Sequence, residues 1–430
     1  MQPSLRRELG LWGAIVMGLG SIVGTGVFVS IGIATGIAGV AVIGSIALAA
    51  IVALCNGLSA AQLAANHPVS GGTYEYGYRY LNSEAGFVAG WLFLLAKSAS
   101  AATAALGFAG YLLSGFGISD RVWIVTLALM AIVALTLIVL SGIQKSHRAN
   151  SAIVGVTLLS LLFFIGVGLP QINLANLTPF FTESNGVDGL FHAAALMFVS
   201  YTGYGRIATM GEEVRHPEKT IPKAMLITLG IAMVLYIAVA VVGIGVSGVG
   251  TMATAALSGA APLEVVARSA SADISSRSFA VKGSSVILTI GAITAMLGVL
   301  LNLILGLSRV LLAMGRRGDM PAAVAQLNRD RTAPSIAVIA VATMIGVLAL
   351  IGNVKTTWSF SAFTVLVYYA LTNLCALRLS SIERLYPRWI AWLGFLACLF
   401  LAFWIDVQIW IAGFAMIAFG FIWRRWWTRR

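Results

Sequence analysis

The stretch Gly18-Leu19-Gly20-Ser21-Ile22-Val23-Gly24-Thr25-Gly26-Val27-Phe28, residues 18–28, lies in the middle of the first apolar run, residues 11–34. That run is long enough to span a bilayer, which takes about 20 predominantly apolar residues. Its centre holds four glycines and two hydroxyl residues, which favour a break in the helix. Because an unpaired backbone group is costly in hydrocarbon, a broken helix persists at this depth only where it lines a cavity or packs on protein. The stretch therefore predicts a binding site.

The polarity of such a site follows from the direction of the helix. Gly24, Thr25 and Gly26 would form the N-terminus of the outer half-helix, where free N–H groups and the positive end of the helix dipole attract an anion such as a carboxylate. The alternative is a helix-packing face of the GxxxG type, because Gly20 and Gly24 have that spacing. This stretch alone leaves both interpretations open.

Composition places the whole chain in a membrane. Of its 430 residues, 59% are hydrophobic and 10% are charged, and the mean hydropathy is +0.95. These values exclude a soluble domain and predict an all-α polytopic membrane protein with the lipid bilayer as a partner. We expect twelve transmembrane spans, at residues 11–34, 38–63, 85–114, 122–142, 150–170, 188–211, 224–247, 283–313, 334–352, 357–377, 388–404 and 406–424.

The net charge of +12 is explained by topology. With the N-terminus inside, 19 of the 27 basic residues fall in cytoplasmic segments. This asymmetry predicts a multi-pass protein of the plasma membrane, in bacteria the inner membrane, with both termini cytoplasmic and no nucleic-acid partner. The three cysteines lie in apolar runs without a pairing pattern, and the four histidines lack metal-ligand spacing, so we expect no disulfide, metal or cofactor.

A second interrupted span strengthens the binding-site interpretation. Gly203 and Gly205 break span six, with Ser200 and Thr202 as polar neighbours. Spans one and six are five apart, so they cross the membrane in opposite directions. Two glycine-interrupted spans at corresponding positions of inverted halves are typical of a transporter binding site.

Lys97 lies within span three. A lysine inside the membrane is a functional candidate, because burying an unpaired ammonium costs about 2.5 kcal/mol or more. The alternative is that its side chain extends to the cytoplasmic interface. The sequence leaves both open.

Four motifs in register resemble the amino acid–polyamine–organocation (APC) superfamily of secondary transporters. They are Gly24–Phe28, the P-x-S-G-G-x-Y pattern of Pro68–Tyr74, Glu212–Pro222, and Ser308–Pro321. The resemblance implies two inverted five-helix repeats with discontinuous helices 1 and 6, followed by two C-terminal helices. The corresponding boundaries are 1–173 for spans 1–5, 174–380 for spans 6–10, and 381–430 for spans 11–12 with a basic tail.

Carried over residue by residue, the resemblance implies a substrate site formed by Ser21, Ile22, Gly24, Thr25, Gly26, Leu94, Ser98, Phe198, Val199, Tyr201, Thr202 and Gly203. The substrate carboxylate would bind the N–H groups of Thr25 and Gly26. The ammonium would bind the carbonyls of Ile22, Val199 and Thr202. Leu94 and Ser98 would face the substrate side chain, and Phe198 and Tyr201 would form a gate or pocket walls.

Two departures concern coupling. Thr157 stands where similar proton-coupled members carry a lysine in span five, and Leu297 and Gly298 stand where sodium-coupled relatives use Ser or Thr. Lys97 and Thr157 are therefore the coupling candidates. Lys97 could have taken over as the titrating group, or the protein could be an exchanger or an uncoupled facilitator.

The expected function is secondary active transport of L-amino acids, neutral ones first, by alternating access, with protons as a partner or by exchange. The alternatives are an amine or polyamine transporter of the same fold and, less favoured, a channel. An enzyme is not expected, because no Ser/His or Asp/Asp pair occupies facing spans. The sequence does not specify the oligomeric state.

Three further motifs have simpler interpretations. Gly243–Gly248 matches GxGxxG, but it follows a long helix and indicates a helix end rather than a dinucleotide loop. Asn176 begins a weak glycosylation motif. Glu212 and Glu213 favour helix-end ion pairing, or a cytoplasmic gate with Arg79 or Arg309.

Overall fold

A computed structural model describes residues 10–67, 71–141, 147–181, 186–208, 214–258, 261–272, 279–327 and 334–427. The secondary-structure elements within these ranges are helices. The first half contains α1 (Leu11–Ile22), η1 (Gly26–Ser30), α2 (Ile31–Ala38), η2 (Gly39–Ala41), α3 (Val42–Asn66), α4 (Thr73–Tyr80), α5 (Ser83–Ser114), α6 (Arg121–Leu140), α7 (His147–Gly168), η3 (Leu169–Gln171) and η4 (Leu174–Leu177). The second half contains α8 (Val187–Tyr201), η5 (Thr202–Tyr204), α9 (Gly205–Ala208), α10 (Pro217–Ser258), α11 (Pro262–Ala272), α12 (Phe279–Arg317), η6 (Ala322–Ala325), α13 (Ser335–Ile351), α14 (Val354–Leu377), α15 (Arg388–Phe403) and α16 (Val407–Trp427).

The helices have the lengths and composition of a polytopic membrane protein. Among the described residues, eight helical runs are long and apolar enough to cross a membrane, and α1, α13 and α15 are shorter apolar helices. Every predicted span coincides with a helix or a broken helix. Because several of these segments are short on their own, the number of twelve crossings stays a prediction.

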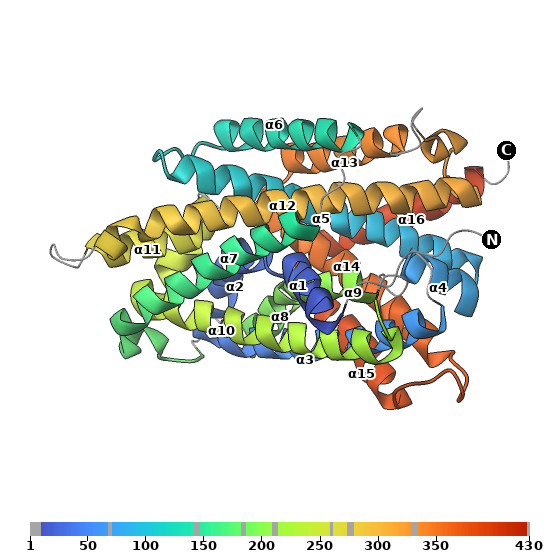
Figure 1. Cartoon of the computed structure of the whole chain (residues 1–430), viewed down its shortest axis with the longest axis horizontal. Helices are drawn as coiled ribbons and strands as arrows, with labels where there is room; N and C mark the ends of the chain where they lie inside the picture. The colour runs from blue at the N-terminus through green and yellow to red at the C-terminus, as the bar shows by residue number, and fades with distance from the viewer. Residues whose placement is uncertain are drawn as a thin grey trace.

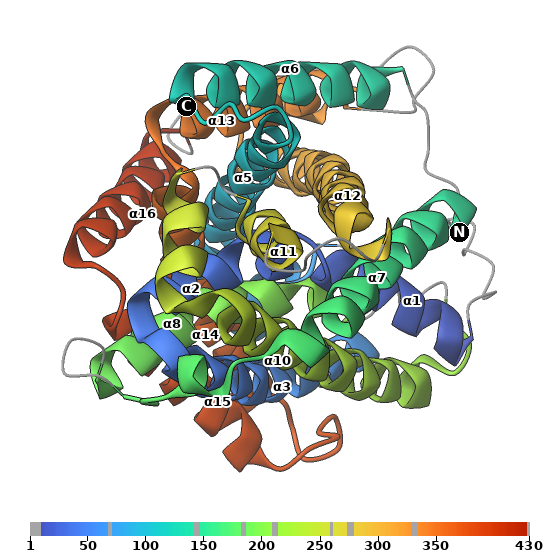
Figure 2. The ribbon, with the colours of Figure 1, turned by 90° about the vertical axis from the view of Figure 1, so that its left-hand side faces the viewer.

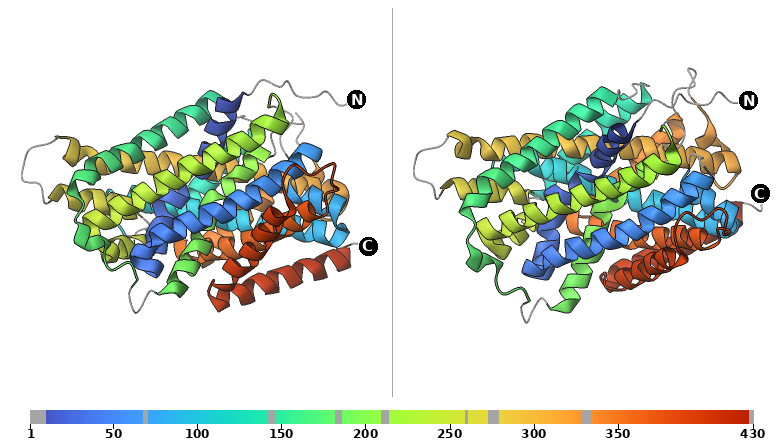
Figure 3. Two further views of the ribbon diagram at one scale, coloured as in Figure 1. Left: turned by 90° about the horizontal axis from the view of Figure 1, so that it is seen from below. Right: turned by 60° about the horizontal axis from the view of Figure 1, so that its bottom comes forward.

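The long helices run along one axis of the molecule. Figure 1 shows α11 at one end of the bundle and α4 at the other, and we call these the α11 end and the α4 end. Viewed along the axis, α6 and α13 lie together on one outer edge (Figure 2). The second half of α8, residues 193–201, is buried. The C-terminal helices α15 and α16 lie on the outside of the bundle (Figure 3).

The predicted break in the first span is present. Helix α1 ends at Ile22, and Val23 has an extended ψ of 105°. The helix resumes at Thr25 and continues as a π-helix over Gly26–Ser30 and then as α2. The predicted break in span six is present as well, because α8 ends at Tyr201 and three residues of 3₁₀-helix lead into α9. Both interruptions fall where glycines and hydroxyl residues weaken the α-helix.

The structure adds two local details to the predicted spans. The segment between spans two and three lies outside the predicted spans, but it contains α4, which Gly71 and Gly72 introduce with positive φ values of 130° and 56°. Glu75 in its first turn and Arg79 in its last turn complement the helix dipole. The segment Gly243–Gly248 ends a helical segment, as expected from the sequence. Gly248 has φ 77° and ψ 165°, which are not helical values, and a second helical segment follows this kink and ends at Ser258.

Candidate functional site

The two helix breaks contact each other through backbone atoms. A Cβ atom at Gly203 would lie 2.1 Å from the carbonyl oxygen of Ser21 and 2.7 Å from the nitrogen of Ile22. A Cβ atom at Gly26 would lie 2.5 Å from the Cβ of Ser200. Only glycine permits these approaches. The structure therefore brings together Ser21, Ile22, Gly26 and Gly203.

The N-terminal side of the first break presents free hydrogen-bond donors. The N–H groups of Val27 and Phe28 both donate to the carbonyl of Gly24, at 3.1 and 3.3 Å. The N–H groups of Gly24 and Thr25 make no hydrogen bond within the described part of the chain, and the Oγ1 of Thr25 is buried there without a partner. These three donors lie at the positive end of a continuous helical run to Ala38. Such a group suits an anion.

The carbonyl ends of the two breaks accept hydrogen bonds from hydroxyl groups. The Tyr236 hydroxyl lies 2.8 Å from the oxygen of Ile22 and 3.3 Å from that of Ser200. The Tyr369 hydroxyl donates to Thr202 O at 3.2 Å, and Thr202 Oγ1 donates to Val199 O at 2.7 Å. Each carbonyl has two lone pairs, so these bonds leave room for a second donor.

Tyr236 and Tyr369 were not among the predicted site residues. Tyr236 connects the two breaks from α10, and Tyr369 reaches the second break from α14. In the sequence, Tyr236 is the one tyrosine in the apolar span 224–247, and a hydroxyl group near the middle of this span is the signal that could have identified it.

Lys97 points toward the second break. Its Nζ donates to Thr202 Oγ1 at 2.8 Å, and Thr202 is the residue that caps the C-terminal end of α8. The alternative that Lys97 extends to the interface is therefore wrong for this conformation. Lys97 makes no ion pair with any described acidic residue. Its ammonium instead faces the negative end of the α8 dipole, which is favourable for a cation.

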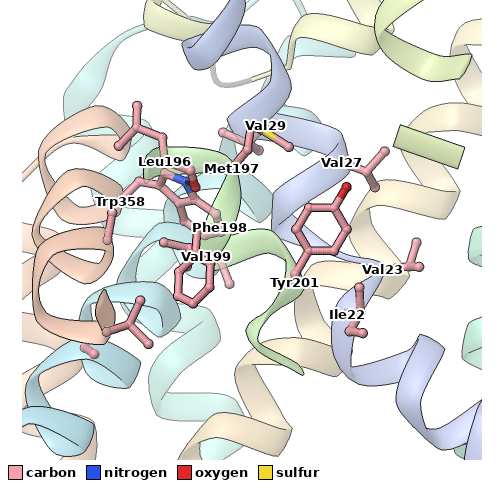
Figure 4. Close-up of a cluster of buried hydrophobic side chains, with 14 of the residues drawn as sticks. Ile22, Val23, Val27, Val29, Leu196, Met197, Phe198, Val199, Tyr201 and Trp358 are labelled. Atoms are coloured by element: carbon pink, nitrogen blue, oxygen red, sulfur yellow. Dashed lines mark hydrogen bonds between the residues drawn. The ribbon is translucent and has the colours of Figure 1, made fainter. Parts of the chain in front are cut away.

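The buried apolar side chains around the two breaks come mainly from η1 and α8 (Figure 4). Figure 4 shows Phe198, Val199 and Trp358 on one side and Tyr201 beside Ile22, Val23 and Val27 on the other. The Phe198 ring packs edge-on against Tyr369, with centroids 5.7 Å apart.

Three other predicted side chains have distinct surroundings. Tyr201 donates to the Ile46 carbonyl of α3 at 3.2 Å, which fixes its ring against the surrounding helices. Leu94 and Ser98 are buried on α5, one turn apart, and Ser98 Oγ has no hydrogen-bond partner among the described residues. Within the same residues, no hydrogen bond joins either of them to the breaks.

Thr157 lies beside the first break, in a small pocket between α1, α7 and α12. The pocket is lined by Leu19, Gly20, Val23, Ile153, Val154, Thr157, Ala295, Gly298 and Asn302. Thr157 Oγ1 donates to Ile153 O at 2.8 Å within its own helix. The lining side chains are neutral, and Asn302 is a polar member that sequence analysis did not identify. A titrating group is present at Lys97 and not in this pocket.

At the α4 end, three elements meet at the carboxylate of Asp319. It accepts hydrogen bonds from the hydroxyls of Tyr74 at 2.7 Å and Tyr78 at 2.7 and 2.8 Å, and it lies 3.5 Å from Nε of Arg424. Burial, and then the hydrogen bond to this carboxylate, raise the pKa of Tyr78, so its hydroxyl stays a donor. We call Tyr74, Tyr78, Asp319 and Arg424 the Asp319 cluster.

The structure describes some of the residues predicted to form a cytoplasmic gate or a glycosylation motif. Glu212 and Glu213 lie outside the described residues. Of their expected partners, Arg79 contacts His67 Nδ1 at 2.8 Å and Arg309 is exposed. The side-chain amide of Asn176 donates to Gly245 O at 3.0 Å, so the nitrogen that glycosylation would modify is already bonded.

Comparison of the sequence with known proteins identifies a family for this chain. The model of the amino acid permease family matches residues 9–428. An uncharacterized transporter of Mycobacterium tuberculosis is 39% identical over 425 residues, which cover 97% of this chain and 90% of the relative. The branched-chain amino acid permease of Bacillus subtilis is 29% identical over 364 residues, 81% of this chain and 75% of the relative. A methylthioribose transporter of Bacillus subtilis is 28% identical over 390 residues, 85% of this chain and 81% of the relative.

The family match covers both helix breaks, Lys97 and the Asp319 cluster. Its extent, and the names of the relatives, indicate a transporter rather than an enzyme, with a membrane as its environment and a small molecule as its substrate. This chain belongs to the amino acid permease family, within the APC superfamily that its sequence motifs resemble.

Proposed function

We propose that this protein is a secondary active transporter that moves L-amino acids across the plasma membrane by alternating access. One observation carries the proposal. The two helix breaks cross at Gly203, and beside the crossing the N–H groups of Gly24 and Thr25 and the Thr25 hydroxyl are donors without an acceptor among the described residues. A free amino acid has a carboxylate for these donors and an ammonium for the carbonyl ends of the neighbouring helices.

The substrate class that fits best is a neutral amino acid. The walls formed by Phe198, Val199 and Trp358 are apolar, and the Lys97 ammonium disfavours a cationic side chain. The branched-chain permease of Bacillus subtilis supports the same class. An amine or polyamine substrate would leave the donors at Thr25 without an acceptor, and no described acidic side chain bonds to the breaks to hold a second ammonium.

The proposed membrane arrangement follows the repeat boundaries. Residues 1–173 and 174–380 would form inverted repeats, each with a broken first helix, and residues 381–430 would add α15, α16 and the basic tail. The α4 end would face the cytoplasm, because Arg79, Arg317 and Arg424 lie there. Lys97, at the second break, is the favoured coupling group, and Thr157 is the weaker candidate.

Uptake into proteoliposomes tests this proposal. A panel of labelled L-amino acids and their decarboxylated amines should give saturable uptake of one or more neutral amino acids and none of the amines. Uptake of amines alone would favour the polyamine alternative. Linear uptake without saturation would favour a channel, because two breaks that close on one site predict occlusion.

A further inference from the structure

We infer that the substrate ammonium and the proton on Lys97 compete for one place, the C-terminal end of α8, so that substrate binding releases a proton. This inference rests on the proposed function and specifies whether protons and amino acid cross the membrane in the same direction or in opposite directions. A protein of this kind exchanges amino acid for protons across the membrane, instead of carrying both in the same direction.

The geometry places Lys97 at the cation-binding end of the second break. The Nζ of Lys97 is 2.8 Å from Thr202 Oγ1, and that hydroxyl is 2.7 Å from the carbonyl oxygen of Val199. The last carbonyls of a helix and the negative end of its dipole favour a cation. The substrate ammonium needs the same carbonyls, so both positive charges are directed to one short segment.

The surroundings do not supply a negative charge that would let both cations stay. No described acidic residue pairs with Lys97. Close to Thr202, the titratable groups of η5 and α14 are Tyr204, Tyr368 and Tyr369, which contact one another and are neutral as phenols; the Tyr369 hydroxyl bonds to Thr202 O. The charged residues on the other helices packed against α5 include Glu75 and Arg79 on α4, Arg309 on α12, Arg424 on α16 and Arg121 on α6, and none of them bonds to Lys97.

Two ammonium groups within a few ångströms of each other disfavour double occupancy. Of the two, Lys97 can lose its charge. Its –NH₃⁺ gives one proton to water and becomes –NH₂, and the amine can still donate a hydrogen bond to Thr202. By linkage, a bound substrate then lowers the proton affinity of Lys97, and a bound proton lowers the substrate affinity by the same factor.

The consequence for transport follows from mutual exclusion. The site holds either a protonated lysine with no substrate or a substrate with a neutral lysine. If both of these forms change their access from one side to the other, each substrate that crosses is balanced by a proton that crosses in the opposite direction. Co-binding of the two would produce symport.

Proton release can be counted directly on the purified full-length protein. We would titrate it, in weakly buffered detergent solution with a pH indicator, with the amino acid that it transports, and measure affinity from about pH 5.5 to about pH 8.5. We expect close to one proton released per substrate bound at the acidic end, and an affinity that rises by up to about tenfold per pH unit before it levels off.

Variants assign the proton to its residue. Lys97→Met, which keeps the length of the side chain without a titrating group, should bind substrate with a pH-independent affinity and release no proton. Lys97→Arg stays charged and should bind weakly at every pH. Lys355→Met removes a lysine in the first turn of α14, and this variant should release the proton as the wild type does. The wild-type proton count and pH slope test the inference even if a Lys97 variant does not fold.

The outcomes distinguish a failure of this inference from a failure of the proposed transport function. Proton uptake on binding, a pH-independent wild-type affinity, or unchanged release in Lys97→Met would overturn the competition while leaving amino acid transport in place. If no amino acid binds or is transported at any pH, the proposed function fails, and the inference fails with it.

Discussion

Replacing Gly203 with alanine tests the contact between the two helix breaks. The new Cβ would lie 2.1 Å from the Ser21 oxygen, 2.3 Å from the Ser21 carbonyl carbon and 2.7 Å from the Ile22 nitrogen. All three are backbone atoms, so no side chain can rotate away. To reach the 3.4 Å of an ordinary contact, the nearest atom must move by about 1.3 Å.

The expected cost follows from overpacking. An added methyl group in a packed interior typically costs about 1–3 kcal/mol, and here the displaced atoms belong to the proposed substrate site. We expect Gly203→Ala to lower substrate affinity by at least about tenfold, because about 1.4 kcal/mol corresponds to a factor of ten. The thermal midpoint of the purified protein should also fall.

Gly230→Ala is the matched control. Gly230 lies in α10, and a Cβ at this position has no atom within 4 Å. This substitution should leave affinity unchanged and stabilise the helix by up to about 1 kcal/mol. The assays are substrate uptake into proteoliposomes at increasing concentration and thermal unfolding in detergent. If Gly203→Ala matched Gly230→Ala in both, the close crossing of the two breaks would be refuted.

Three further substitutions test contacts described above. Tyr236→Phe removes the hydroxyl that bonds to Ile22 O and Ser200 O. It should destabilise the protein by about 1 kcal/mol in thermal unfolding and weaken substrate binding. Unchanged affinity would show that this hydroxyl does not position the breaks. Asp319→Asn should lower the free energy of unfolding by about 1.5–3 kcal/mol, because it weakens the hydrogen bonds from Tyr74 and Tyr78. Asp188→Asn, at an exposed position, should lower it little. Equal effects would show that the Asp319 cluster does not stabilise the fold. Tyr111→Phe removes a hydrogen bond of 2.6 Å to Phe28 O and one of 3.4 Å from Leu263 N. It should speed amide hydrogen exchange in α11, the helix that contains Leu263. Unaltered exchange would mean that Tyr111 does not stabilise this helix.

Sequence patterns were sufficient to locate both breaks. Glycines beside hydroxyl residues weaken an apolar helix at one point along its length, and the structure confirms a break after Ile22 and another after Tyr201. The direction of the first half-helix also followed from sequence, because chain direction alone decides that Gly24 and Thr25 are at its positive end.

Side-chain directions could not be predicted in the same way. Whether Lys97 faced the site or the interface depended on how α5 is rotated against η5, which no local pattern encodes. Tyr236 and Tyr369 meet the breaks only because α10 and α14 pack beside them. The helix α4 was not predicted because its residues are polar and aromatic, and because its tyrosines Tyr74 and Tyr78 bond to Asp319, a partner that is distant in the sequence.

The most direct test of the central claim compares an L-amino acid with its own decarboxylated amine as competitors for uptake, in the wild type and in Thr25→Val. Thr35→Val is the control, because the Thr35 hydroxyl is buried but already bonded to Ile31 O at 2.7 Å. The account predicts that the wild type and Thr35→Val prefer the amino acid strongly, and that Thr25→Val loses about tenfold or more of this preference, since a hydrogen bond to a charged group contributes about 1.5–3 kcal/mol. Equal competition by the amine in the wild type, or an undiminished preference in Thr25→Val, would contradict a carboxylate site at the first helix break.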